Sequence, residues 1–138
     1  MSALEKIIEW YTTLSLDTLP DIADIYAARA RFKDPFNEVE GVVEIEKIFL
    51  HMFATTDKPH FIFIDHFQQE NQAFLSWHFL FGLNGKSYTV KGATHLRFDP
   101  NGKVVEHRDY WDPAEELWQK LPFIGAIVGW LRAKFKAS

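Results

Sequence analysis

Cysteine is absent from this 138-residue chain, which excludes disulfide bonds, cysteine metal ligands and thiol nucleophiles. An excess of cationic residues is also absent, because 15 Lys and Arg face 19 Asp and Glu and give a formal net charge of −4. Nucleic-acid binding relies on a basic patch. We therefore expect no nucleic-acid partner.

Long hydrophobic runs are missing as well, since no segment approaches the roughly 20 apolar residues that span a bilayer. The N-terminal segment MSALEKIIEWY mixes charged with apolar residues, unlike a secretory signal. A chain of this length suits one domain. These features predict a soluble, cytoplasmic, single-domain protein.

Aromatic residues, by contrast, are abundant: the chain has 13 Phe, 5 Trp and 4 Tyr. Aromatic side chains bury large apolar areas and dominate the cores in which they lie. Such a surplus indicates a core or a cavity whose walls are built from rings.

The N-terminal half predicts three helices and one short strand. Apolar residues recur at helical spacing over residues 3–15 and 42–53, as expected for amphipathic helices. Between them, polar residues followed by Pro20 begin a second helix, which extends to Tyr26. Residues 31–36 then alternate, with Phe32, Asp34 and Phe36 on one face.

The second half predicts strands instead. Residues 60–68, 73–83 and 86–111 alternate with the period of two that is typical of half-buried strands. Asn84-Gly85 is a two-residue hairpin signal, and the sequence DPNG at residues 99–102 is a second turn. Helices followed by a mostly antiparallel sheet predict an α+β domain.

The last predicted strand carries polar residues on an apolar face. His107 and Asp109 share that face with Val105 and Trp111. A buried imidazole and carboxylate need hydrogen-bond partners or a function. Either this face lines a pocket or it is open to water.

The C-terminal segment predicts a helical extension of the domain. Asp112 followed by Pro113 is a plausible helix start, and residues 123–135 are almost wholly apolar with a basic end. We therefore expect a main domain over residues 1–113 and an extension over residues 114–138. The extension could cover the cavity or pack in a dimer, and attachment to a membrane surface is a less favoured alternative.

Four stretches, in this order, resemble one known superfamily: IIEWYTTL, ARARFKDPF followed by GVVEIEKIF, GATHLRFDPNGKVV, and HRDYWD. The chain up to Asp112 resembles the nuclear transport factor two-like superfamily, in its SnoaL-like and ketosteroid isomerase-like branch. The resemblance implies a cone-shaped fold, with N-terminal helices packed on a strongly curved, mostly antiparallel sheet. It implies less about activity, because this fold serves enzymes, ligand binders and protein adaptors.

Compared with ketosteroid isomerases, the chain matches in part. Asp34 before Pro35 stands where these enzymes have their general base, and Tyr11 stands where they have a tyrosine that donates to the substrate oxyanion. Thr94 occupies the position of their second donor, a protonated Asp. That carboxylic acid is kept neutral by its apolar site in the isomerases, and a hydroxyl is a weaker donor.

The last strand is similar to another branch of the same superfamily. The sequence HRDYWD resembles the corresponding strand of limonene epoxide hydrolases and SnoaL-type polyketide cyclases, in which the Asp acts as acid or base. The Arg-x-Asp that the epoxide hydrolases carry on an earlier strand is absent here. The resemblance therefore implies an acid/base role for Asp109, assisted by His107.

Four further residues are candidates for contact with a ligand. These are Thr94, Trp111, Phe36 and His78. Each also has a structural interpretation, as does each catalytic candidate: Asp34 can start a turn, Tyr11 can belong to the core, and Asp109 can pair with an Arg or His. The remaining histidines show no ligand spacing, so we expect neither a metal nor another cofactor.

Three functions therefore remain open. The first is an acid/base enzyme that isomerises, cyclises or dehydrates a small apolar carbonyl compound, with Asp34 or Asp109 as its base. The second is a non-catalytic protein that binds a lipid or a polycyclic ligand. The third is a protein-interaction module. We also expect a homodimer.

Overall fold

The computed structural model describes residues 1–117 and 133. A six-stranded sheet dominates it, with the strand order β2-β1-β6-β5-β4-β3. The strands are β1 (Tyr26–Lys33), β2 (Glu38–Glu40), β3 (Asp57–Gln69), β4 (Gln72–Leu83), β5 (Lys86–Phe98) and β6 (Val104–Tyr110). Neighbours pair antiparallel except β1 and β6, which are parallel.

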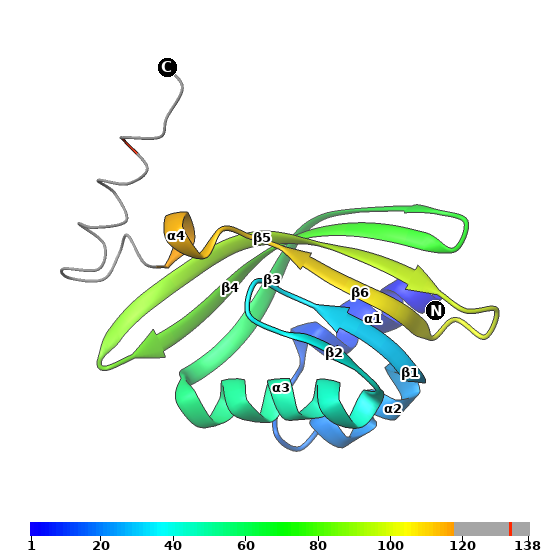
Figure 1. The fold of residues 1–138 in the computed structure, drawn as a ribbon, viewed down its shortest axis with the longest axis horizontal. Coiled ribbons are helices and arrows are strands. Elements are labelled where there is room, and N and C mark those ends of the chain that lie inside the picture. The colour runs from blue at the N-terminus through cyan, green and yellow to red at the C-terminus, as the bar shows by residue number, and fades with distance from the viewer. Residues whose placement is uncertain (118–132, 134–138) are drawn as a thin grey trace.

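The N-terminal helices cover one face of this curved sheet (Figure 1). They are α1 (Ala3–Thr12), α2 (Ile22–Ile25) and α3 (Val42–Thr55), with a 3-10 turn at Leu19–Asp21 before α2. We call the covered face the inner face. The main core lies between it and the helices, and is made of apolar side chains such as Ile7, Ile45 and Leu96. The predicted α+β architecture is confirmed.

Local signals explain where α1 and the hairpins begin. Ser2 and Glu5 form a reciprocal capping box at the start of α1. Asn84 and Gly85, which join β4 to β5, both adopt positive φ, as a two-residue hairpin turn of this kind requires. Gly102, in the turn before β6, also has a positive φ of 80°.

The segment around Tyr26 differs from its prediction. The second helix is a single turn, and Tyr26 begins β1 instead of ending that helix. β1 also ends at Lys33, so Asp34 and Phe36 lie in the turn that leads to β2, a strand that was not predicted. The reason is tertiary, because β1 pairs in parallel with β6, Phe32 opposite His107.

A short helix begins at the predicted Asp112-Pro113 start. The Asp112 carboxylate accepts a hydrogen bond from the Ala114 amide at 2.9 Å and caps α4 (Pro113–Glu116). The Glu116 carboxylate in turn accepts from the Lys91 amide of β5 at 3.1 Å. Residues 118–132 and 134–138 lie outside the described part of the chain, and with them most of the predicted extension and its membrane-surface alternative. Within residues 1–117 and 133, no helix is long and apolar enough to cross a membrane.

Candidate active site

A cavity of about 380 Å³ opens on the inner face of the sheet. This volume lies within the usual range for small-molecule pockets. Its walls come from α3, from the turn after β1 and from β3 to β6. Aromatic rings form most of the lining: Phe32, Phe36, Phe49, Phe61, Trp77, Phe79, Phe81 and Trp111. The aromatic wall predicted from composition is therefore present.

Asp109 is one of the few charged residues that line this cavity. Its Oδ1 accepts a hydrogen bond from the Thr94 hydroxyl at 2.6 Å and lies 2.7 Å from His107 Nε2. Its side chain is 17% exposed, whereas that of His107 is 4% exposed. Within the described residues, the hydrogen bonds to this carboxylate reach Oδ1, and Oδ2 receives none.

Asp109 also lines a second, much smaller cavity of about 30 Å³. Tyr11, Thr94 and His107 line it together with Asp109, and none of the first three lines the larger cavity. Asp109 borders both. The carboxylate therefore stands between a ligand-sized space and a buried polar network.

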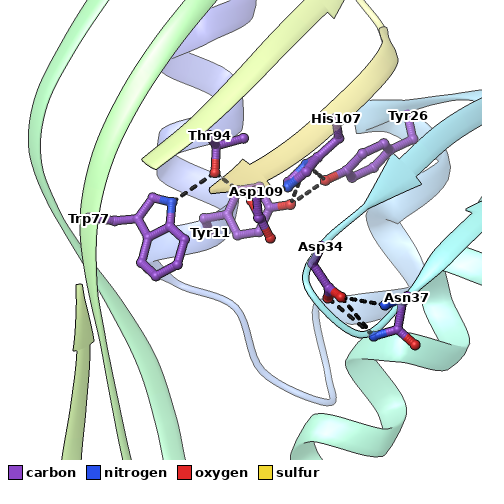
Figure 2. A network of polar contacts seen from close by, with 8 residues as sticks. All are labelled: Tyr11, Tyr26, Asp34, Asn37, Trp77, Thr94, His107 and Asp109. Carbon is purple, nitrogen blue, oxygen red and sulfur yellow. Dashed lines mark hydrogen bonds and ion pairs between the residues drawn. The ribbon is translucent and has the colours of Figure 1, made fainter. Parts of the chain in front are cut away.

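The network continues from Asp109 through His107 to two tyrosines (Figure 2). His107 Nδ1 lies 2.8 Å from the Tyr26 hydroxyl and 3.3 Å from the Tyr11 hydroxyl, and the two hydroxyls bond to each other. The imidazole also packs against the Phe32 ring, 4.4 Å between centroids. Both nitrogens of this buried ring therefore have partners.

In the other direction the network ends at an indole. Trp77 Nε1 donates to the Thr94 hydroxyl at 2.7 Å. Trp77 is paired with Gly92 on the neighbouring strand, and a Cβ at that position would lie 2.5 Å from Trp77 Cη2. Glycine at this position thus allows the indole to lie flat against β5 and reach Thr94.

Strand order brings these residues together. Asp109 and His107 alternate on β6, which is hydrogen-bonded to β5 on one side and to β1 on the other. Thr94 is directly opposite Asp109 in the antiparallel pair, so their side chains point to the same face. Tyr26 reaches the same place because it starts β1, the parallel neighbour of β6.

Burial has a clear electrostatic consequence for both tyrosines. It raises the pKa of Tyr11 well above its usual value, and the neighbouring Tyr26 and Asp109 raise it further. Burial likewise raises the pKa of Tyr26, and the charge of Asp109 adds to this effect. Both groups therefore remain hydroxyls, able to donate, across the ordinary pH range.

Asp34 is placed differently. It also lines the larger cavity, but its Oδ1 accepts from the backbone amides of Phe36 and Asn37 at 2.8 and 2.6 Å. The Asn37 side-chain amide contacts both carboxylate oxygens, at 3.1 and 3.2 Å. In Figure 2 these two residues form a group separate from the network around Asp109. The carboxylate closes the turn between β1 and β2.

The structure brings together some of the predicted ligand contacts. Phe36 and Trp111 both line the larger cavity, with ring centroids 5.6 Å apart. Thr94 acts on Asp109 and lines only the smaller cavity. His78 lines neither, because it lies on the opposite face of β4 from Trp77 and is paired with Ile62.

Two members of the network were not predicted. Trp77 shares a strand face with Leu75 and Phe79 and has the pattern of a core residue, while the local pattern around Tyr26 is helical. Only the pairing of Trp77 with Gly92, and of β1 with β6, brings these two side chains to the site. Among residues 1–117 and 133, no group of three or more metal-ligating side chains is present.

Comparisons with known proteins agree on the fold. A family model described as a SnoaL-like domain matches residues 7–107. No curated protein matches the sequence.

Solved structures are similar over most of the chain. A nuclear transport factor two-like protein of unknown function from Burkholderia pseudomallei is 20% identical, with a TM-score of 0.73 over 83% of this chain and 95% of that one. A putative SnoaL-like polyketide cyclase from Jannaschia sp. is 12% identical, with a TM-score of 0.70 over 80% and 85%. TerC, co-crystallised with polyporic acid, is 13% identical, with a TM-score of 0.72 over 82% and 93%.

Proposed function

Because this chain belongs to the SnoaL-like domain family, we propose that it binds a small apolar carbonyl compound and removes a proton from the carbon next to the carbonyl. Asp109 is the base. Isomerisation, cyclisation and dehydration of such compounds can each begin with this step, so the proposal covers all three outcomes. The observation that carries it is the position of Asp109, whose Oδ2 is uncommitted within the described residues at the edge of a ring-lined cavity.

The immediate partners of Asp109 support this role. Thr94 and His107 both bond to Oδ1, so the carboxylate is held in one orientation without using the second oxygen. A positioned side chain that abstracts a proton contributes about 10²–10⁴-fold to a reaction rate. Holding that group in a near-attack geometry adds the benefit of an orientation that is fixed in advance.

Asp34 is the weaker candidate for the base. Both of its oxygens already receive hydrogen bonds in the turn. A substrate proton would have to compete with those donors. We therefore assign Asp34 to shaping the mouth of the cavity, where Phe36 and Trp111 also lie.

Structural neighbours are consistent with the proposed substrate class. One is a putative polyketide cyclase, and another was co-crystallised with polyporic acid. At 12 and 13% identity they show a common fold only. The cavity lining of this chain supplies the argument for an apolar ligand.

Hydrogen–deuterium exchange of a simple ketone tests the proposal without knowledge of the natural substrate. Acetophenone in deuterium oxide is followed by NMR for loss of its methyl proton signal, with the wild-type protein and with Asp109→Asn. We expect exchange above the buffer rate for the wild type, lowered by about 10²–10⁴-fold in the variant. Equal exchange by both proteins would exclude Asp109 as the base.

The scarcity of polar groups in the cavity lining favours a second candidate, a non-catalytic binder of a lipid or polycyclic ligand. Native mass spectrometry with organic extraction identifies any molecule that co-purifies with the protein. A tightly held apolar molecule, together with no exchange of acetophenone by the wild type, would favour the binder.

We also propose a homodimer formed through the outer face of the sheet. Helices α1 to α3 cover the inner face, and within residues 1–117 and 133 the outer face carries apolar side chains that are about half exposed or more: Ile62, Phe67, Phe74 and Tyr110. Exposed apolar side chains gathered on one face are typical of interaction sites, and Phe67 and Phe74 are directly paired there. Native mass spectrometry of the wild type and of Phe74→Lys tests it, with a dimer expected only for the wild type.

A further inference from the structure

We infer that Tyr26, supported by Tyr11, is a positioning residue that fixes the direction of the hydrogen bonds through His107. In this arrangement Nδ1 accepts from Tyr26 and Nε2 donates to Asp109 Oδ1. The inference rests on the proposed role of Asp109 as the base. It concerns two tyrosines that do not line the ligand-sized cavity.

The direction is set at the indole end first. The Trp77 Nε1–H can only donate, and it is 2.7 Å from the Thr94 oxygen. Thr94 accepts this bond, and its own hydroxyl proton points to Asp109 Oδ1, 2.6 Å away. An ionised carboxylate only accepts, so this half of the network has one consistent arrangement.

The imidazole offers a choice of two arrangements. A neutral imidazole donates from one nitrogen and accepts at the other. If Nε2 donates to Asp109, Nδ1 accepts from Tyr26, and the Tyr26 oxygen is free to accept from Tyr11. If Nδ1 carries a proton, Tyr26 must accept it and turn its own hydroxyl toward Tyr11.

The second arrangement leaves a donor unused. Within the described residues, the Tyr11 hydroxyl contacts only the Tyr26 hydroxyl and His107 Nδ1. In the second arrangement the Nδ1 proton points to the Tyr26 oxygen and the Tyr26 proton points to the Tyr11 oxygen. The Tyr11 proton then has no acceptor. Tyr11 is only 6% exposed, and a buried donor without a partner costs free energy. The first arrangement satisfies every group.

This direction decides where a substrate proton goes. A proton taken up at Asp109 Oδ2 cannot pass directly to His107, because Nε2 already carries a proton and the unprotonated Nδ1 faces Tyr26. The raised pKa values of Tyr11 and Tyr26 keep both groups as hydroxyls, so neither can absorb the proton. The proton is therefore not relayed along the network: Asp109 returns it to a carbon of the same substrate or exchanges it with water through the cavity, since its side chain is 17% exposed. That behaviour suits a reaction that uses a single base.

The test is the ¹⁵N spectrum of the histidine rings in the full-length, ligand-free protein at neutral pH. Unprotonated and protonated imidazole nitrogens resonate in well-separated regions, and the signals of His107 are assigned by their loss in His107→Asn. We expect Nδ1 in the unprotonated region and Nε2 in the protonated region. The opposite assignment, or two protonated nitrogens, would overturn the inference.

Matched variants test the part played by each tyrosine. In Tyr26→Phe, Nδ1 loses its nearer donor, and its resonance should move toward that of a nitrogen without a hydrogen bond. Tyr11→Phe should move it less. Tyr88→Phe, a buried tyrosine in a separate cluster, should leave it unchanged.

An unchanged Nδ1 resonance in a folded Tyr26→Phe would also overturn the inference, and the wild-type spectrum tests it even if that variant does not fold. Because these spectra need no substrate, they stand apart from the proposed function. Loss of acetophenone exchange in Tyr26→Phe would then connect the hydrogen-bond direction with the proposed function. If the wild type catalyses no exchange, the proposed function fails while the hydrogen-bond direction can still hold.

Discussion

Two carboxylates border the same cavity, and their surroundings differ. Asp34 receives hydrogen bonds from residues two and three positions away in the chain. Asp109 receives its bonds from Thr94, fifteen residues away, and from His107, which is itself held by Tyr26 eighty-one residues away. One site is a local turn, and the network of the other is assembled from five elements, α1, β1, β4, β5 and β6.

This difference separates a structural carboxylate from a candidate base. A turn can be completed by any segment with suitable local sequence, and it engages both carboxylate oxygens of Asp34. The network around Asp109 uses only one oxygen, while burying the groups that hold it. A buried polar network destabilises the fold unless every member has a hydrogen-bond partner. In the described residues no buried side-chain N or O atom lacks a partner.

The largest expected effect contrasts the two aspartates in the acetophenone exchange assay. Asp109→Asn should lower exchange by about 10²–10⁴-fold, whereas Asp34→Asn should change it less than about threefold, because Asn keeps an acceptor for the turn amides. Rates are compared after circular dichroism shows that both variants are folded. Equal losses in the two variants would remove the distinction between them.

Alkaline pH should weaken the network but not the turn. The unfolded chain ionises Tyr11 and Tyr26 near pH 10, while their raised folded pKa values keep them protonated in the native state. Their contribution to stability is therefore complete below about pH 10 and is lost as the pH rises further. Above about pH 10, ionisation of each tyrosine in the unfolded chain lowers the free energy of unfolding by up to about 1.4 kcal/mol per pH unit.

Denaturant unfolding between neutral and strongly alkaline pH measures this slope. The double variant Tyr11→Phe with Tyr26→Phe should lose the part of the slope that belongs to these two groups. A double variant whose stability falls as steeply as that of the wild type would show that the tyrosines ionise equally in both states.

Thr94 offers a smaller and more local test. Thr94→Val should lower the free energy of unfolding by about 1–3 kcal/mol, because the Trp77 N–H loses its acceptor inside the protein. Thr94→Ser keeps the hydroxyl and should cost less, so it is the matched control. Equilibrium unfolding in urea measures both. If Thr94→Ser were destabilised as much as Thr94→Val, the cause would be lost packing of the methyl group and not the lost hydroxyl.

The smallest expected effect lies in the turn. Asp34→Ala removes the acceptor of the Phe36 and Asn37 amides and should cost about 0.5–2 kcal/mol, as the loss of similar side-chain caps does. Asp34→Asn should lower the free energy of unfolding by less than half of that amount. Thermal unfolding of the two variants distinguishes them, and an alanine variant as stable as the wild type would mean that solvent replaces the carboxylate.

Much of this arrangement could be predicted from strand periodicity. Alternation grouped Thr94 with the apolar residues of β5 and His107 with Asp109 on one face of β6, and helical spacing placed Tyr11 on the apolar side of α1. The bulge between β5 and β6 was beyond such patterns: Val104 is fully buried, and Val105 is only partly so. His78 shows a further limit, because alternation separates the two faces of a strand but does not say which one meets the helices.

The sequence by itself determined α1, α3, the turns at residues 84–85 and 99–102, the alternation of β5 and the abundance of aromatic rings, because side-chain period and turn chemistry act over a few residues. Only the tertiary structure decided that Asp34 completes a turn while Asp109 joins Thr94, His107 and Tyr26. That outcome depends on the parallel pairing of β1 with β6 and on the absence of a side chain at Gly92 beneath Trp77. Such contacts join distant segments, and their energies are absent from any local pattern.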